Sequence, residues 1–344
     1  MFQPQYTITD QLLANIKRVS SLVNELNNKR FPNVVLLELE RSAREVSSYA
    51  STSIEGNPLP LTEVKKILKS APSHIRDSEK EVINNNHALQ DLNKQLKDDE
   101  IELSLQFILK IQKQVIEGLL PKFETGFLRK QPVDVNDPRT GQPVYLPPDV
   151  TDVKPLMEDL VKFTNKNRGS IDSLILAGIF HKQMVIIHPF MDGNGRTTRL
   201  VTKALLAALG LNTFNLFSFE NYYNSNVTKY FQTVGEFGNY YELVEKIDFT
   251  NWLVYFTEGI IDELLRVQKL LPQVALSPES ELQPYHLKVL EFIQKKGFIS
   301  DSDYAKLTGR AKATRALDFQ KLTELGLIER HGKGRATYYV LKEK

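Results

Sequence analysis

Apolar residues recur at steps of three and four positions through most of the first hundred residues. Leu, Ile and Val follow this spacing in residues 7–26 and again in residues 34–50. The spacing places apolar side chains on one face of a helix and favours an amphipathic helix over a strand. It predicts an N-terminal helical region over residues 1–105.

The pattern changes over residues 126–149. Val133 and Val135, and then Val144 and Leu146, alternate with other residues on either side of the turn-rich sequence NDPRTG. Alternation of this kind is typical of strands, and Asn, Asp, Pro and Gly are typical of turns. We therefore expect a β-hairpin that interrupts the helices.

Helical periodicity returns after the hairpin. Residues 171–187 predict a helix with an apolar face, and a second helix begins near Arg196 and is expected to stop at Gly210. These elements predict a mainly α domain over residues 106–270. The segment 271–284, rich in Pro, Ser and Glu, is expected to be a linker.

The last segment has an element order of its own. Residues 285–344 predict three helices and a hairpin, the order found in winged helix-turn-helix domains. Residues 284–344 carry 13 Lys and Arg against 7 Asp and Glu, although the whole chain has a net charge of only +2. The fold class is thus mainly α, with a hairpin and a basic C-terminal domain.

Composition narrows the class of protein. A chain of 344 residues with 41% hydrophobic residues can form two or three domains with sizeable cores. The absence of cysteine excludes disulfides and Cys-ligated zinc. Neither a signal-peptide pattern nor an apolar run of about 20 residues is evident, so we expect a cytoplasmic protein without a membrane partner.

The sequence HPFMDGNGRTTR, residues 188–199, lies where one apolar helix breaks off and another begins. Pro189 disfavours helical geometry at His188, which leaves the imidazole beside a loop. Gly193 and Gly195 allow unusual backbone conformations. The helix that follows presents unpaired N–H groups and its positive dipole end, a combination that binds anions.

Charged residues of the same stretch extend this interpretation. A carboxylate at an anion site, Asp192, is tolerated if a cation such as Mg²⁺ lies between it and a phosphate. Arg196 and Arg199 share one helix face, and their guanidinium groups suit phosphate oxygens. The stretch does not fit the P-loop spacing, so an ordinary NTPase is disfavoured.

The stretch resembles the Fic motif, His-x-Phe-x-Asp/Glu-Gly-Asn-Gly-Arg-x-x-Arg, and matches it at every fixed position. The resemblance implies a helical Fic core that transfers AMP from ATP to a Ser, Thr or Tyr hydroxyl of a protein. In that case His188 is the general base, Asp192 binds Mg²⁺ and Phe190 anchors the loop in the core. The implied nucleotide-binding residues are Gly193, Asn194, Gly195, Arg196, Thr197, Thr198 and Arg199.

Two further segments resemble parts of this family. The hairpin is similar to the flap that aligns a target segment, and its candidate residues are Val133, Asp134 and Val135, although an ordinary surface hairpin is the alternative. The segment NVTKYFQTV resembles the one whose aromatic pair borders the adenine, which implies that Tyr230 and Phe231 lie near the base.

His181 precedes His188 by seven residues and lies on the same helix face. A dinuclear metal site would need more ligands than these two histidines, and no further His or helical carboxylate pair accompanies them. We therefore expect His181 to be a structural residue.

The segment 51–56 resembles the inhibitory motif of the Fic family, Ser/Thr-x-x-x-Glu-Gly/Asn. Ser51 and Glu55 are four residues apart on one helix face, and Gly56 indicates the helix end. The resemblance implies that Glu55 pairs with Arg199 and occupies the group that should receive the γ-phosphate of ATP. A related enzyme that mainly removes AMP, or transfers another phosphate-containing group, is an alternative.

The basic C-terminal domain suggests further partners. Arg310, Lys312 and Arg315 would lie on the recognition helix, and residues 330–335 would form the tip of the wing, so DNA is a candidate partner. Protein docking is an alternative role for such a domain. The partners expected for the whole chain are ATP, a target protein that can be the enzyme itself, and a second copy in a homodimer. The competing hypothesis from another class is an ATP-sensing, DNA-binding regulator.

Overall fold

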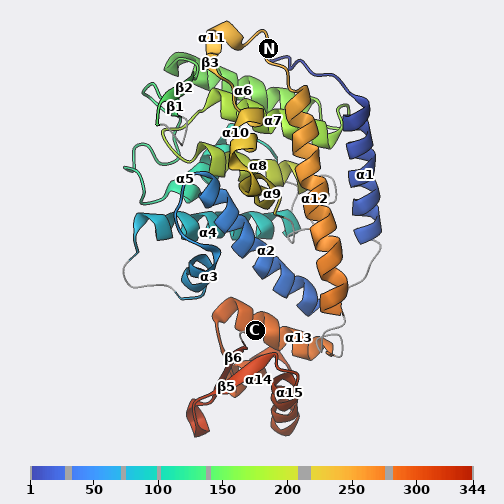
Figure 1. The fold of residues 1–344 in the computed structure, drawn as a ribbon. Helices are drawn as coiled ribbons and strands as arrows, with labels where there is room; N and C mark the ends of the chain where they lie inside the picture. Colours follow the sequence, from blue (N-terminus) through green and yellow to red (C-terminus); the bar gives the residue numbers. More distant parts are fainter. Residues whose placement is uncertain are drawn as a thin grey trace. The chain divides into compact units, whose positions relative to one another are not determined.

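A computed structural model describes residues 2–27, 33–70, 75–98, 102–136, 141–207, 218–275 and 282–342. The described chain is mainly helical, as the sequence predicts (Figure 1). It divides into two compact units. The first comprises Met1–Asn28 and Ser42–Arg266, and the second comprises Lys29–Arg41 and Val267–Lys344.

Helices make up most of the first unit, although α2 and α12 each extend past its boundary. The helices, in chain order, are α1 (Asp10–Asn27), α2 (Asn33–Ile54), α3 (Leu61–Lys69), α4 (Asp77–Asp98), α5 (Leu105–Ile116), α6 (Val150–Lys166), α7 (Ser173–Ile187), α8 (Asn194–Ala207), α9 (Glu220–Ser225), α10 (Val227–Val234), α11 (Tyr240–Leu243) and α12 (Thr250–Ala275).

Helix α7 lies at the centre of the core. Apolar residues surround almost its whole circumference, and α6 and α8 pack against it. Helix α12 also approaches it closely, because Trp252 Nε1 donates a hydrogen bond to the carbonyl of Gly178 at 2.7 Å. A Cβ at Gly178 would lie 2.6 Å from Cδ2 of Leu253, so this approach requires glycine.

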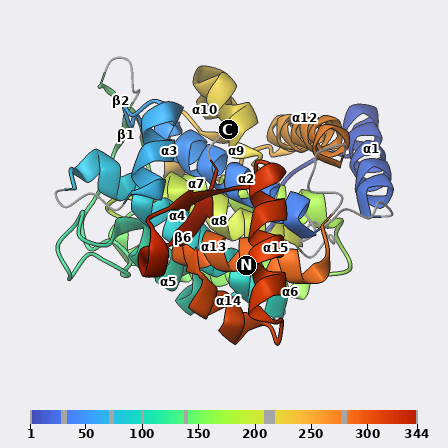
Figure 2. The ribbon, with the colours of Figure 1, turned by 90° about the horizontal axis from the view of Figure 1, so that it is seen from below.

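Helices α8 and α1 pack against the other helices of this unit. Helix α8 packs against α4 and α5 as well as α7. Helix α1 lies along α12 in both views (Figures 1 and 2), where Asn15 Nδ2 donates to Thr257 Oγ1 at 2.9 Å. The loop between α7 and α8, which holds the Fic-like sequence, is therefore supported from several sides.

A small sheet includes the predicted hairpin. Strand β1 (Val135–Asn136) pairs antiparallel with β2 (Pro143–Leu146), and β2 pairs in parallel with β3 (Gly238–Asn239). The order β1-β2-β3 leaves β1 at the edge. Residues 137–140, which belong to the predicted turn, lie outside the described residues.

The second unit has its own core, formed by Val289, Ile293, Ile299, Tyr304 and Phe319 with their neighbours. Its sheet has the order β4-β6-β5. Its elements are α13 (Pro284–Lys296), β4 (Ile299–Ser300), α14 (Asp301–Leu307), α15 (Lys312–Glu324), β5 (Ile328–His331), a 3₁₀ turn (Gly334–Ala336) and β6 (Tyr338–Leu341).

Two expected boundaries differ from the structure or fall outside it. Helix α12 continues to Ala275, so the first residues of the segment 271–284 are helical rather than a linker. Pro272 interrupts the helical pattern of the sequence without ending the helix. Residues 276–281, and Gly210 as the expected end of α8, lie outside the described residues.

Within the described chain, none of the helices combines the length and the apolar character needed to cross a bilayer.

Candidate active site

The loop that joins α7 to α8 begins at His188, where the backbone leaves helical geometry. His188 is the C-cap of α7, and it adopts a left-handed conformation with φ of 48°. This conformation is uncommon for a residue other than glycine. Arg129 stabilises it, because its Nε donates to the carbonyl of His188 and its backbone N–H donates to that of Pro189, each at 2.9 Å.

The His188 imidazole lies in the wall of a cavity. Burial lowers the pKa of His188 to about 4, against smaller raising effects from the Val185 carbonyl and from Glu55. The ring is therefore neutral at pH 7. When Nδ1 carries the proton, it faces the carbonyl of Val185 at 3.4 Å, and Nε2 keeps a free lone pair.

The side-chain amide of Asn194 closes the rest of the loop. Asn194 Oδ1 accepts from the N–H of Phe190 and Asn194 Nδ2 donates to its carbonyl, each at 2.9 Å, while the Phe190 ring is fully buried. Phe190 thus anchors the loop as expected. The amide of Asn194 is committed to closing the loop, so this residue has only its backbone to offer a phosphate.

The first two residues of helix α8, Asn194 and Gly195, line the same cavity. Its first helical hydrogen bond runs from Thr197 N to Gly193 O at 2.9 Å, so the N–H groups just before Thr197 have no helical acceptor. Gly195 lines the cavity. A Cβ at Gly195 would overlap Oε1 of Glu55 and would lie 2.9 Å from Nη1 of Arg199. Space above this turn is therefore filled by Glu55.

The ion pair between Glu55 and Arg199, expected from the sequence, is present in the structure. Arg199 Nη2 donates to Glu55 Oε1 at 2.7 Å and to the carbonyl of Ser51 at 2.7 Å, and Arg199 Nε donates to Ser51 Oγ at 2.9 Å. The guanidinium is fully buried. Burial lowers the pKa of Arg199, but the Glu55 carboxylate and Tyr230 together raise it above its usual value.

Arg196 lies elsewhere than the sequence suggests. Its side chain is buried, and it donates from Nη1 to Glu81 Oε1 at 3.1 Å and from Nη2 to Asp192 Oδ1 at 2.8 Å. It does not line the cavity. Two carboxylates therefore occupy the guanidinium of the first arginine of the motif. Asp192 and Arg199 do not line the cavity either, whereas Glu55, which pairs with Arg199, does.

The remaining nucleotide-binding candidates separate into two groups. Gly193 does not line the cavity, and its N–H donates to Oδ1 of Asp192. Thr197 and Thr198 are fully buried and do not line the cavity, because their positions on α8 face the core. Tyr230 and Phe231 both line it. Tyr230 is almost fully buried, whereas Phe231 is partly exposed.

His181 is buried below Tyr230. Its Nε2 lies 3.0 Å from the hydroxyl of Tyr230, and its Nδ1 lies 3.1 Å from Oγ1 of Thr202. Both ring nitrogens therefore have protein partners. Burial lowers the pKa of His181 well below its usual value, which keeps the ring neutral. These contacts give His181 a structural environment.

The cavity lined by His188, Gly195, Tyr230 and Phe231 has a volume of about 190 Å³ and is lined mainly by apolar surface. The flap contributes Val135 to it, while Val133 and Asp134 lie before strand β1 and do not line it. Tyr145 fixes the flap, because its hydroxyl donates to the carbonyl of Ile186 at 3.0 Å. The remaining lining residues include Glu55, Asn136, Val144, Val185, Asn194, Val227, Thr228, Gln232, Val234, Gly235, Glu236 and Phe237.

Sequence reasoning missed three residues that shape this site. Arg129 holds the turn at His188, Glu81 pairs with Arg196, and Lys182 anchors the cavity wall through a 2.8 Å ion pair with Glu236. Burial lowers the pKa of Lys182, and Glu236 opposes this effect. A lysine within an apolar helix was the available signal for this pair. Nothing in the spacing of Arg129 or Glu81 indicates its partner.

Comparison with known proteins identifies similar chains. The model of the Fic/DOC family matches residues 102–206. Protein adenylyltransferase Fic of Aedes aegypti is 28% identical over 219 residues, which cover 58% of this chain and 42% of that protein. The protein of the same name from Drosophila erecta is 27% identical, with the same 58% and 42% coverage. The chain thus spans less than half the length of these relatives.

Solved structures share the fold. A Fic family protein from Desulfovibrio desulfuricans G20 superimposes with a TM-score of 0.63 at 20% identity, and the match covers 100% of this chain and 99% of that one. A fragment of Fic-1 from C. elegans gives a TM-score of 0.59 at 24% identity, with 76% of this chain and 72% of that chain covered.

Proposed function

Because residues 102–206 are a Fic/DOC-family domain, we propose that the chain is a protein adenylyltransferase that transfers AMP from ATP to a Ser, Thr or Tyr hydroxyl of a target protein. The observation that carries the proposal is one cavity lined at the same time by His188, by Gly195 at the start of α8 and by Phe231. A base, an anion-binding turn and an aromatic wall are what this transfer needs.

In the proposed reaction the oxygen of the target hydroxyl attacks the α-phosphorus of ATP. The bond between that phosphorus and the oxygen bridging to the β-phosphate breaks, pyrophosphate leaves, and the proton of the hydroxyl passes to Nε2 of His188. The low pKa of this ring, about 4, keeps it unprotonated and ready to accept the proton at neutral pH. Arg129 keeps the ring in place by holding the carbonyl of His188.

Asp192 is the residue that suits the Mg²⁺ of an ATP complex. Its side chain is 48% exposed, and both of its hydrogen bonds, from Gly193 N and Arg196 Nη2, use Oδ1, which leaves Oδ2 for a cation. No group of three or more His, Cys, Asp or Glu side chains converges within the described residues. This donor set fits Mg²⁺, which commonly takes one or two carboxylates and completes its shell with phosphates and water, and it would neutralise phosphate charge.

The nucleotide would occupy the cavity with its base toward the aromatic wall. Phe231 and Phe237 border the apolar part, and the N–H groups at the start of α8 would receive phosphate oxygens. Arg199 would then receive the γ-phosphate, once Glu55 leaves it. Glu55 and the γ-phosphate compete for one guanidinium, so the Ser51–Gly56 segment would act as a brake.

Label transfer tests the reaction. We expect protein to take up label from α-³²P-ATP and not from γ-³²P-ATP, and the Glu55→Gly variant to take up more than the unchanged protein. His188→Ala should take up none. Uptake from γ-³²P-ATP would indicate a kinase, and loss of label from a pre-labelled target without pyrophosphate would favour AMP removal. The transfer of another phosphate-containing group would appear as a different mass increment.

We further propose that the C-terminal unit is a winged helix-turn-helix domain, with DNA or a docked protein as its partner. The order of its helices and its three-stranded sheet support this topology. Arg310, expected on the recognition helix, lies before it, because α15 begins at Lys312. Arg310 pairs with Asp318 at 2.7 Å, and Arg315 on α15 pairs with Asp301 at 2.8 Å, so this region has less free positive charge than its sequence suggests.

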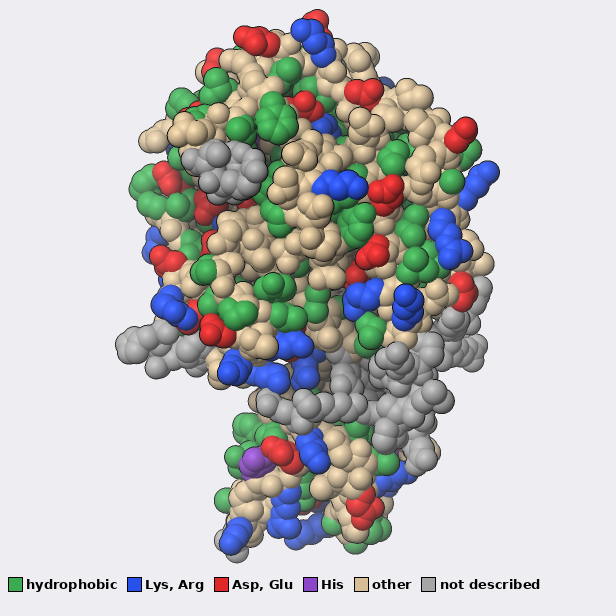
Figure 3. Space-filling view, viewed as in Figure 1, with side chains coloured by type: hydrophobic (Ala, Val, Ile, Leu, Met, Phe, Trp, Pro, Cys, Tyr) green, Lys and Arg blue, Asp and Glu red, His purple; other side chains and the backbone are tan. Residues whose placement is uncertain are grey.

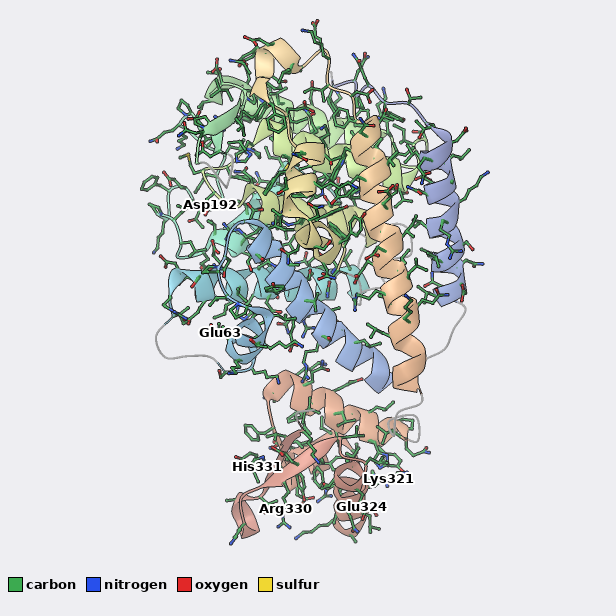
Figure 4. All side chains as sticks on the ribbon, viewed as in Figure 1. Glu63, Asp192, Lys321, Glu324, Arg330 and His331 are labelled. Atoms are coloured by element: carbon green, nitrogen blue, oxygen red, sulfur yellow. The ribbon has the colours of Figure 1, made fainter. Side chains whose placement is uncertain are left out.

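The sheet side of this unit offers an alternative surface for a nucleic acid. His331 stacks on Tyr338 with ring centres 5.4 Å apart, and Tyr338 contacts Phe298 edge to face at 5.7 Å. Figure 4 places Arg330 and His331 together on β5, and Figure 3 shows Lys and Arg side chains on this unit among acidic ones. Salt-dependent binding of a DNA duplex, lost in Tyr338→Ala and retained in Arg315→Ala, would support contact through the sheet. An ATP sensor without transferase activity would bind DNA and take up no label.

A further inference from the structure

The first arginine of the motif is enclosed by carboxylates. Arg196 is 1% exposed and bridges Glu81 Oε1 at 3.1 Å and Asp192 Oδ1 at 2.8 Å. These two contacts use different terminal nitrogens of one guanidinium. Arg196 is therefore held between α4 and the motif loop, outside the cavity that would receive the nucleotide.

Glu81 is itself fixed from its other side. Its Oε2 accepts from Asn57 Nδ2 at 2.7 Å, and the same Asn57 amide donates to the carbonyl of Ser78 at 2.8 Å. The backbone N–H of Asn57 in turn donates to the carbonyl of Thr52 at 3.1 Å. Both oxygens of Glu81 are thus occupied, and its carboxylate has a defined orientation.

We propose that Glu81 is a positioning residue for the cation site, and that Arg196 serves Asp192 rather than a phosphate. The inference rests on the proposed function. With Glu81 in place, Arg196 donates from one nitrogen to each carboxylate, and Oδ2 of Asp192 stays available for the cation. Without the charge of Glu81, a buried guanidinium has Asp192 as its one acidic partner, and the fork geometry favours a bidentate pair that takes both Asp192 oxygens.

The consequence is a loss of cation affinity with no loss of nucleotide contact. Residues that orient metal ligands typically change metal affinity by about 10- to 100-fold when they are replaced. Because Glu81 acts through one intervening side chain, we expect the lower end, about tenfold, for Glu81→Gln.

The test measures binding directly. Mn²⁺ replaces Mg²⁺ as a paramagnetic probe, and its dissociation constant is measured by electron paramagnetic resonance on the full chain carrying Glu55→Gly, with a non-hydrolysable α,β-methylene analogue of ATP. Glu81→Gln should raise this constant about tenfold and leave the metal-free affinity for the analogue unchanged. Glu63→Gln is the matched control, since Glu63 is exposed on α3, away from Asp192 (Figure 4), and should change neither value.

Two more variants separate positioning from general damage to the fold. Asn57→Ala keeps the charge of Glu81 but removes a hydrogen bond that orients it, so it should raise the Mn²⁺ constant by a smaller factor, about threefold. In an Arg196→Gln background, Glu81→Gln should have little further effect, because the side chain through which it acts is gone.

An unchanged Mn²⁺ constant in Glu81→Gln would overturn the inference. So would a loss of metal-free analogue affinity in Arg196→Gln, which would make Arg196 a phosphate ligand. The proposed function fails separately, on the absence of label from α-³²P-ATP, and a cation effect of Glu81 could still be measured in that case.

Discussion

Replacing Glu55 with glycine should release the site. In the structure Oε1 of the Glu55 carboxylate accepts from Arg199 Nη2 at 2.7 Å, in the space that a Cβ at Gly195 would occupy. The variant removes this carboxylate, while Arg199 keeps its two bonds to Ser51. The guanidinium therefore stays in position with one donor free for a phosphate oxygen.

The size of the effect follows from the type of bond. A hydrogen bond between charged groups contributes about 1.5 to 3 kcal/mol. The Glu55 side chain is 29% exposed, so water screens the pair in part and the lower half of this range applies. ATP no longer has to displace this bond, and the rate of AMP transfer should rise by about 10- to 50-fold.

Initial rates of α-³²P uptake at fixed Mg²⁺ and several ATP concentrations measure the effect. Glu55→Gln is the matched control, because it keeps the shape and an acceptor oxygen but removes the charge, and it should give an intermediate rate. If circular dichroism shows that both proteins are folded, equal rates for Glu55→Gly and the unchanged protein would refute the idea that the Glu55–Arg199 pair limits activity.

Three other results are expected. His188 must be neutral to accept a proton, and its pKa is about 4, so the rate of AMP transfer should change less than about twofold from pH 7 to pH 5 and should fall as the pH drops through 4. A loss of rate of roughly 20-fold by pH 5 would instead indicate an ordinary histidine with a pKa near 6.5. Arg129→Gln removes the hydrogen bond that holds the carbonyl of His188, so kcat should fall by about tenfold or more with little change in the analogue's binding constant, and an unaffected kcat would contradict this positioning role. Gly178→Ala places a Cβ 2.6 Å from Leu253 and should lower the free energy of unfolding by about 1 to 3 kcal/mol in urea titrations, whereas an unchanged midpoint would show that α12 shifts without cost.

Local chemistry made parts of the site predictable. The helix break at His188 follows from Pro189, and the pairing of Glu55 with Arg199 follows from a family resemblance joined to helix spacing. The hairpin strands follow from alternation of apolar residues. Each of these depends on residues close in sequence or on a motif that fixes both partners.

Long-range partners were not predictable in the same way. Glu81 and Arg196 are 115 residues apart, and neither periodicity nor spacing indicates that they meet. Strand β3 has two residues and forms through its parallel pairing with β2, so it has no strand pattern of its own. Thr197 and Thr198 sit inside the motif, yet the turn of α8 directs them into the core.

The position of Glu55, directly after α2, means that a small movement of the chain would release Arg199. Glu55 lies just past the last helical residue, Ile54, and Gly56 follows it in a left-handed conformation with φ of 91°. In the proposed brake, Glu55 belongs to the same chain as Arg199, so its occupancy of the guanidinium would not depend on protein concentration. A ligand or partner that stabilises this terminal turn in a displaced position by about 2 kcal/mol would suffice to free Arg199 for the proposed reaction.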